Sequence, residues 1–246
     1  MNEAEELLAR ITGTVEYLRV TVGRDDGGWI ECEQLVNEAD RLGELVQSTK
    51  AGRGTDRDDV AMSLFVQAYA FRIASVAIGG WLMGDAVIDL VPTRTAIALG
   101  RDRPNAVAVD GARLIPVDEP LTGLHEALIE GHLARLVRAA HEATRVGEPL
   151  LWGNVAASCA SSFGAFSGEL PHRRLEIRDR AEAFFASARP QLAGAGRLVR
   201  LGDQWAWERK SCCLWYLTDS GFKCEDCSLW TDEERRRRYA ANEAGS

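Results

Sequence analysis

The stretch VAMSLFVQAYAFRIASVAIGGWL, residues 60–82, decides the fold. It is apolar on most of its faces, and a helix of that kind is buried on nearly all sides. The preceding AGRGTDRDD, residues 51–59, is typical of a loop, and its last residues are acidic, which favours a helix N-terminus. The sequence therefore predicts a long central helix against which the other elements pack.

Helical patterns flank this stretch on both sides. Apolar residues recur at helical spacing in residues 2–20 and again in residues 30–46, with Gly27-Gly28 between them. Further helices are predicted downstream over residues 121–144, 151–166 and 175–188.

Two segments interrupt the helices. Residues 86–117 are short β-branched runs, and Asp110-Gly111 is a hairpin turn signal. They predict a small, mainly antiparallel sheet. Residues 197–209 predict two short strands joined by Gly202-Asp203. The predicted class is α+β: a mainly helical domain over residues 1–200, and a C-terminal cysteine-rich module over residues 201–246 packed on it.

Composition limits the classes of function. The chain has 246 residues and a net charge of -8, and a nucleic-acid binder is normally basic. The N-terminus lacks the apolar run of a signal peptide. The uncharged residues 73–84 are too few to cross a bilayer, and residues 149–168 are too polar. We therefore expect a cytoplasmic protein without a transmembrane segment.

Four of the six cysteines lie within SCCLWYLTDSGFKCEDC, residues 211–227. In a reducing compartment such clusters are more often metal ligands or redox groups than disulfides. Residues 218–221 are turn-forming. A hairpin across this turn would bring Cys224 and Cys227 beside Cys212 and Cys213.

The spacing alone leaves three kinds of centre open. Zinc sites usually combine two short C-x(2–4)-C chelates, and only Cys224 and Cys227 form one. The adjacent Cys212 and Cys213 converge on one small ion only through a bent backbone. A 2Fe-2S cluster offers a wider target with separate thiolate positions. A vicinal dithiol switch is the third possibility.

The run Arg209-Lys-Ser-Cys-Cys-Leu-Trp-Tyr216, followed by Gly221 and Cys224-x-x-Cys227, resembles the C-terminal signature of the FhuF-type ferric-siderophore reductases. Leu151-Trp-Gly-Asn-Val155 also resembles a segment of that family. The resemblance implies a 2Fe-2S cluster held by the four cysteines, and a ferric siderophore as the substrate.

The cofactor motifs of hydride transfer are missing from the sequence. No G-x-G-x-x-G follows a predicted strand, so electrons are expected from a separate donor such as a ferredoxin or a flavoprotein reductase. Fe(III) is a hard ion that oxygen ligands hold tightly, and reduction to Fe(II) loosens them. The alternative is a protein without turnover, either an iron–sulfur sensor or a zinc-stapled interaction protein.

Charged residues lie next to the cysteines. Arg209 and Lys210 precede the first pair and Lys223 precedes the second, so these side chains, or the backbone N–H groups they flank, are expected to lie around the cluster and to favour its reduced form, whereas Glu225 and Asp226 act in the opposite sense. Because a two-residue spacer is the usual single-metal chelate, Cys224 and Cys227 are expected to share one iron. The run Arg235–Arg238 is either a solvated helix surface, with Glu233–Arg237 and Glu234–Arg238 pairs, or a docking patch for an acidic donor.

Trp152, Asn154 and Trp215 are candidates for a substrate cleft, although each is also compatible with a structural position. The remaining metal-ligating or nucleophilic side chains are expected to have ordinary structural roles. They are His125, His132, His141, Cys32 and Cys159.

Overall fold

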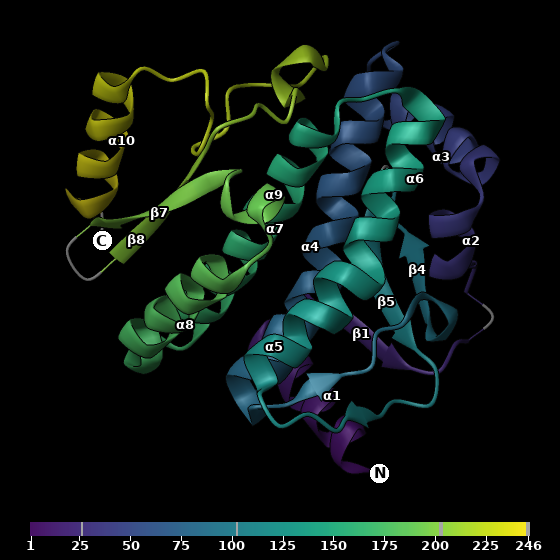
Figure 1. The fold of residues 1–246 in the computed structure, drawn as a ribbon. Helices are drawn as coiled ribbons and strands as arrows, with labels where there is room; N and C mark the ends of the chain where they lie inside the picture. Colours follow the sequence, from purple (N-terminus) through teal and green to yellow (C-terminus); the bar gives the residue numbers. More distant parts are fainter. Residues whose placement is uncertain (26, 102, 202–203, 245–246) are drawn as a thin grey trace.

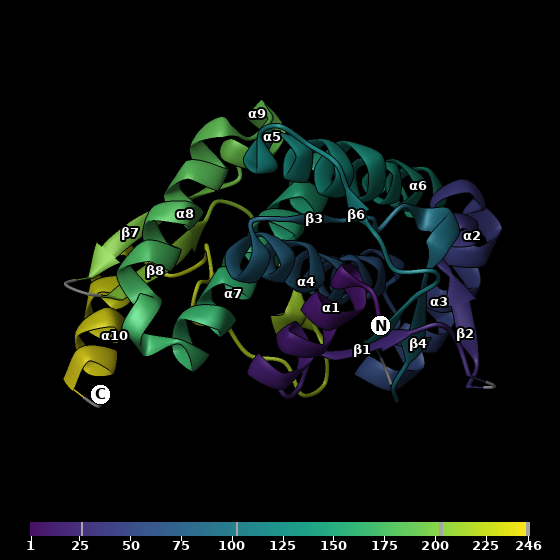
Figure 2. The same cartoon turned by 90° about the horizontal axis from the view of Figure 1, so that it is seen from below.

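The long helix α4 (Asp58–Gly84) lies at the centre of the protein. The structure is a computed structural model that describes the chain except residues 26, 102, 202–203 and 245–246. Figure 2 shows α4 between α7 (Glu148–Glu169), its most extensive partner, and α1 (Glu3–Thr14). The predicted central helix is confirmed. By length and composition α4 is the one described helix that could cross a membrane, but 78% of that apolar window is buried in the protein, as is typical of a core helix.

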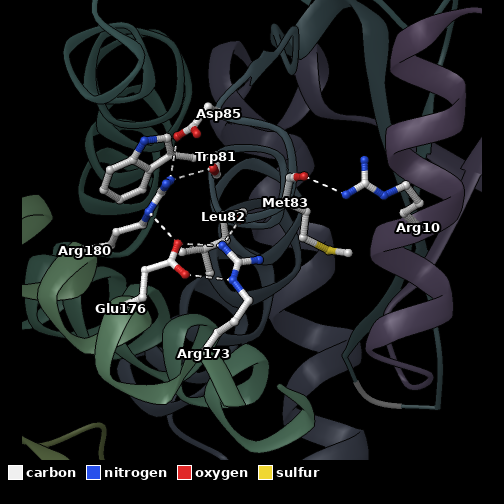
Figure 3. Close-up of polar contacts among 8 residues, drawn as sticks. All are labelled: Arg10, Trp81, Leu82, Met83, Asp85, Arg173, Glu176 and Arg180. Carbon is white, nitrogen blue, oxygen red and sulfur yellow. Dashed lines mark hydrogen bonds and ion pairs between the residues drawn. The ribbon is translucent and has the colours of Figure 1, made fainter. Parts of the chain in front are cut away.

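The C-terminal end of α4 is closed by three arginines from other segments (Figure 3). The last carbonyl groups of a helix have no partners within it and carry partial negative charge. The arginines donate to these groups, Arg10 to Met83 (2.7 Å), Arg173 to Leu82 (2.7 Å) and Arg180 to Trp81 (2.9 Å). Glu176 pairs with both Arg173 and Arg180, at 2.6 and 3.3 Å. The buried helix therefore ends with its polar groups satisfied.

Most of the remaining helices pack either against α4 or against a helix that contacts it (Figure 1). The predicted helix over residues 121–144 is confirmed, with a π-helical stretch, His125–Leu133, in the middle. The helices predicted over residues 151–166 and 175–188 are also confirmed. The bounds are α2 Cys32–Asn37, α3 Ala39–Arg53, α5 Pro120–Leu124, α6 Ala134–Thr144, α8 Arg174–Ser187 and α9 Pro190–Ala193.

The N-terminal helix is shorter than the periodicity predicts. It ends at Thr14, and Arg19–Val22 form strand β1 instead. The prediction failed because β-branched residues at the end of the helical pattern pair with a strand far along the chain. Likewise the predicted helix over residues 30–46 begins as strand β2 (Trp29–Glu31) before α2 and α3 follow.

The main sheet has the strand order β1-β5-β4-β2. Strand β1 pairs with β5 in parallel, and the other pairings are antiparallel, so the sheet is mixed. The turn at Asp110-Gly111 does not close the predicted hairpin, because it leads from β5 to β6, which pairs with β3. The remaining bounds are β3 Val87–Ile88, β4 Thr95–Leu99, β5 Pro104–Val109 and β6 Leu114–Ile115.

The C-terminal part contains a β-hairpin, an irregular stretch and a last helix. Strands β7 (Gly196–Leu201) and β8 (Gln204–Arg209) pair as predicted, although Gly202-Asp203, the predicted turn, lies outside the described residues. Residues 210–231, here called the cysteine segment, lead to α10 (Asp232–Ala244). The α+β class is confirmed, and the predicted boundary after residue 200 falls inside β7.

The hairpin predicted within the cysteine segment is wrong. Residues 215–217 form a 3-10 turn, and the described residues between β8 and α10 contain no strand. The chain reverses by successive turns, in which the Gly221 N–H donates to the Thr218 carbonyl (3.0 Å). A Cβ at Gly221 would lie 1.8 Å from the carbonyl oxygen of Trp215, so this reversal requires glycine.

Candidate metal centre

The cysteine segment brings sulfur atoms from its two ends together. The Sγ atoms of Cys213 and Cys224 are 3.7 Å apart. Cys213 and Cys227 are buried, Cys212 and Cys224 are half-buried, and all four are free thiols. One sulfur of each pair therefore meets the other, and the chain brings them together through turns instead of a hairpin.

Two local backbone features shape the cysteine pairs. Leu214 has a left-handed conformation, with φ +68°, and its N–H points to the Sγ of Cys212 at 3.4 Å. The bend follows the adjacent pair at once and costs a residue other than glycine about 1–2 kcal/mol. Around the second pair, the Cys227 N–H donates to the Cys224 carbonyl (3.1 Å), which also accepts from the Trp230 indole (2.9 Å).

A buried polar network joins the cysteine segment to the two central helices. Ser63 of α4 donates its hydroxyl to the carbonyl of Cys213 (2.8 Å). The amide of Asn154, on α7, donates to both the carbonyl and the hydroxyl oxygen of Ser63, each at 2.8 Å. Its oxygen accepts a hydrogen bond from Arg209. Sequence reasoning missed Ser63, because nothing distinguishes it from any other small residue in an apolar helix.

Arg209 is a buried cation beside the sulfurs. Its side chain is 0% exposed, and its nearest carboxylate oxygen, on Asp226, is 3.9 Å away. Within the described residues, its Nε and Nη1 atoms have no hydrogen-bond partner. A buried guanidinium with free N–H groups is costly unless a further anion lies nearby. The arrangement therefore fits an anionic centre at the cysteines.

The thiols themselves are electrostatically coupled. Hydrogen bonds from Cys212 and Cys224, with a smaller contribution from Arg209, hold the pKa of Cys213 far below its usual range. The same hydrogen bonds raise the pKa values of Cys212 and Cys224. Of these three sulfurs, Cys213 is therefore the one whose surroundings favour the thiolate, the form that binds iron. Among the described residues, no three His, Cys, Asp or Glu side chains are placed to hold a single metal ion.

The three cations predicted around the cluster occupy different environments. Only Arg209 is buried. Lys210 is exposed, and its backbone N–H bonds to the carbonyl of Ala195 (2.9 Å). The Lys223 ammonium lies 4.4 Å from the ring centroid of Trp230. A solvated charge affects a buried centre weakly, so Arg209 is the cation with the largest expected influence on the cysteines.

The three candidates for a substrate cleft also differ in their surroundings. Trp152 is buried with Arg189 stacked over its ring at 4.7 Å, and Asn154 is fully buried in the network described above. Both lie inside the protein instead of on a cleft. Trp215 is half-buried and lines a cavity.

The three histidines do not share a site. His125 stacks on Phe184 with the ring centroids 4.5 Å apart, and His141 bonds to the carbonyl of Val146 (2.7 Å). Burial lowers the pKa of His132 to about 4, and its ring bonds to the Tyr69 hydroxyl and the Leu90 carbonyl, at 2.6 and 2.5 Å. These contacts are structural.

The two cysteines outside the segment, expected to have ordinary structural roles, are fully buried. Burial raises the pKa values of Cys32 and Cys159 to about 12.

Two cavities flank the cysteine segment, and both are lined by Gln67 and Ser161. The larger, about 630 Å³, lies against β8 and α10 and carries charges of both signs, Arg174, Glu225, Asp226 and Arg238. The smaller, about 310 Å³, includes Trp215, and its charged residues are Arg53, Arg72 and Arg103. We call them the hairpin cavity and the arginine cavity. Either is of a size that ligands occupy.

Comparison with known sequences gives a match for the cysteine segment. No curated protein matches the chain. Residues 209–229 match the profile of the FhuF 2Fe-2S C-terminal domain, and this stretch contains Cys212, Cys213, Cys224 and Cys227. The thiol groups and the buried cation beside them fit the cofactor of that domain. The C-terminal part of this chain therefore carries a FhuF-type iron–sulfur domain, whose cofactor is a 2Fe-2S cluster.

Proposed function

We propose that the protein reduces a ferric siderophore by one electron and so releases Fe(II). The observation that carries this proposal is the match of residues 209–229 to the FhuF 2Fe-2S domain. Cys212, Cys213, Cys224 and Cys227 would hold the cluster, with Cys224 and Cys227 on one iron. The segment from β7 onward would act as an iron–sulfur module packed on the helical body.

The cluster supplies one-electron transfer when it is bound. The chain's own residues supply its setting. Cys213 and Cys227 are buried, which keeps water from that side of the centre. Arg209 offsets negative charge, and Ser63 fixes the backbone of Cys213. A ferric chelate takes up one electron, and its oxygen ligands then hold Fe(II) less tightly.

This proposal is tested by reoxidation. The protein with its cluster is reduced by dithionite, freed of excess reductant and mixed with a panel of ferric siderophores beside a ferrous chelator. We expect the visible absorbance to return as Fe(II) appears, one Fe(II) for each electron. If the protein stays reduced with every siderophore, it is a sensor. A colourless protein that contains zinc would refute the cofactor as well.

Arg209 should raise the reduction potential of the cluster, because each added electron increases the negative charge beside a buried cation. Replacing it by Gln keeps an amide donor for Asn154 but removes the charge. We expect the potential to fall by on the order of 50–100 mV. Lys210→Gln is the matched control, since Lys210 is exposed, and its potential should change far less. Potentiometric titration followed in the visible range measures both. Equal shifts would show that burial of Arg209 has no special effect.

The arginines of α10 are not equivalent as a donor-docking patch. Arg235 is largely buried and pairs with Glu208 at 3.4 Å, and Arg238 lies over the ring of Trp230 at 3.9 Å. The predicted Glu233–Arg237 pair is present. Glu234, expected to pair with Arg238, instead accepts hydrogen bonds from Thr231 at 2.8 Å, a helix-capping arrangement.

We therefore expect any contact with an acidic donor to come from Arg236 and Arg237, which are exposed. Changing both to Gln should slow electron delivery from that donor by about three- to tenfold at low salt, and the wild-type rate should fall as salt rises. Stopped-flow reduction measures this, and reduction by dithionite is the control. Unchanged delivery at low salt would make these arginines ordinary helix surface.

A further inference from the structure

The arginine cavity concentrates positive charge in a protein whose net charge is -8. Arg53 comes from α3, Arg72 from α4 and Arg103 from the approach to β5. Among the described residues that line this cavity, none is an aspartate or a glutamate. A pocket lined by three guanidinium groups and by no described carboxylate favours an anion.

The charges of Arg72 and Arg103 are not balanced by a carboxylate in the described part of the chain. Arg72 donates to two backbone carbonyls, those of Tyr17 (2.8 Å) and Pro104 (3.3 Å). Neither Arg72 nor Arg103 forms an ion pair with a described carboxylate. Burial, and then the neighbouring Arg103 and Arg19, lower the pKa of Arg72, while Tyr17 acts in the opposite direction. The guanidinium groups therefore repel one another, and an anion placed among them would relieve that repulsion.

Positive charge continues next to the cavity. Arg72 and Arg103 also line an adjoining hollow of about 380 Å³, together with Arg19 and Arg101. Glu16 is on its wall as well. The region that an anion would approach is therefore wider than the cavity itself.

The cavity also meets the cysteine segment. Trp215 lies two residues after Cys213, and its ring contacts that of Phe222 with the centroids 4.6 Å apart. The indole N–H of Trp215 is buried and has no acceptor among the described residues. A ligand with negatively charged oxygen atoms would accept from both the indole and the arginines, and it would rest against the segment that holds the cluster.

We infer that the arginine cavity binds an anionic ferric chelate, one whose iron is held by catecholate or carboxylate oxygens. This inference rests on the proposed function. Three doubly charged catecholates around Fe(III) make a trianion, and citrate-type chelates are also negative. Three singly charged hydroxamates around Fe(III) make a neutral complex that gains little from arginines. In the hairpin cavity, by contrast, the lining combines Arg174 and Arg238 with Glu225 and Asp226, so that lining has no net preference for an anion.

The test measures binding without electron transfer. Gallium(III) has the charge and nearly the size of Fe(III) but is not reduced under these conditions. Equilibrium dialysis of the oxidised protein with its cluster would use gallium tris-catecholate, gallium citrate and a neutral gallium tris-hydroxamate. We expect at least one anionic chelate to bind about tenfold more tightly than the neutral one, with an affinity that falls as salt rises. Comparing the catecholate and citrate arms identifies the kind of ligand.

Variants locate the site. Arg103→Gln should weaken binding of the anionic chelate about three- to tenfold and leave the neutral one unchanged, because Arg103 is exposed and a single charge is removed. The double variant Arg72→Gln/Arg103→Gln should abolish the preference for the anion. Arg174→Gln removes the same charge from the hairpin cavity and should have no effect.

The binding measurements can contradict the proposed anion site in two ways. Equal affinity for all three chelates, or an equal loss in Arg174→Gln, would overturn it. The outcome is also separable from that of the proposed function. Selective gallium binding without reduction of the matching ferric chelate would contradict the reductase activity alone. Reduction that is indifferent to Arg103 would contradict the arginine cavity alone.

Discussion

Replacing any one of Cys212, Cys213, Cys224 and Cys227 by Ser is expected to abolish the visible absorption of the cluster or to shift it strongly. Thiolates are the normal terminal ligands of a 2Fe-2S cluster, and a serine oxygen is a harder and weaker donor for it. The four residues are also the only cysteines of the domain that matches residues 209–229. Absorption spectra together with iron and sulfide content per chain measure the loss.

The matched controls are the two cysteines of the helical body. Cys32 and Cys159 are fully buried, and neither lies in the cysteine segment. Cys32→Ala and Cys159→Ala should keep the visible spectrum and the iron content of the parent protein. Loss of the spectrum in either variant, with the fold intact by circular dichroism, would mean that the ligand set is wrong.

The largest loss of stability is expected for Asn154→Ala. This change removes the amide that bonds to both Ser63 and Arg209, and it leaves the buried guanidinium without a hydrogen-bond partner among the described residues. Leaving a buried donor or acceptor unsatisfied typically costs about 1–3 kcal/mol, and more for a charged group, and this change removes hydrogen bonds to both a neutral residue and a buried cation. We expect a decrease of that order in the free energy of unfolding, and a lower cluster content, because Ser63 no longer holds Cys213 firmly. Thermal unfolding and iron analysis measure the two effects.

Two further variants separate these effects. Asn154→Asp keeps an acceptor for Arg209 but loses the donor to Ser63, so it should be less destabilised than Asn154→Ala. Ser162→Ala removes a buried hydrogen bond of 2.9 Å between the same two helices, to Ser75. It should cost about 1–3 kcal/mol and leave the cluster spectrum unchanged. If Asn154→Ala unfolds like the parent and keeps full iron, the network does not position the cysteines.

Local sequence patterns were sufficient to predict much of this fold. The apolar run of α4 predicts a buried helix because a helix without a polar face has to be covered. The cysteine spacing likewise predicted that the two pairs would approach each other, and Cys213 and Cys224 do so at 3.7 Å between their sulfurs, although no hairpin joins them. The sequence patterns did not predict which strands pair when they lie far apart in the chain. The pairing of β1 with β5 is parallel and joins residues far apart in the chain, and no local periodicity encodes such a partner.

The polar residues that contact the cysteines could not be predicted from the sequence either. Arg209 and Lys210 are adjacent, and the sequence gives them the same charge, yet one is buried and the other solvated. Arg209 is the last residue of β8 and reaches the side chain of Asn154, whereas Lys210 lies just beyond the strand. Ser63 lies 150 residues before Cys213. Neither composition nor spacing relates two such positions, so only the folded chain reveals their contact.

That separation has a consequence for how the protein is made. Ser63 and Asn154 leave the ribosome well before the cysteines do, and the helices that carry them pack mainly on each other. The helical body can therefore form first and present a hydrogen-bond donor to the carbonyl of Cys213 when it emerges. Iron delivery then acts on a prepared scaffold. Variants that damage the body should accumulate as iron-free polypeptide even though all four cysteines are intact, so maturation in the cell reports on α4 and α7 as much as on the ligands.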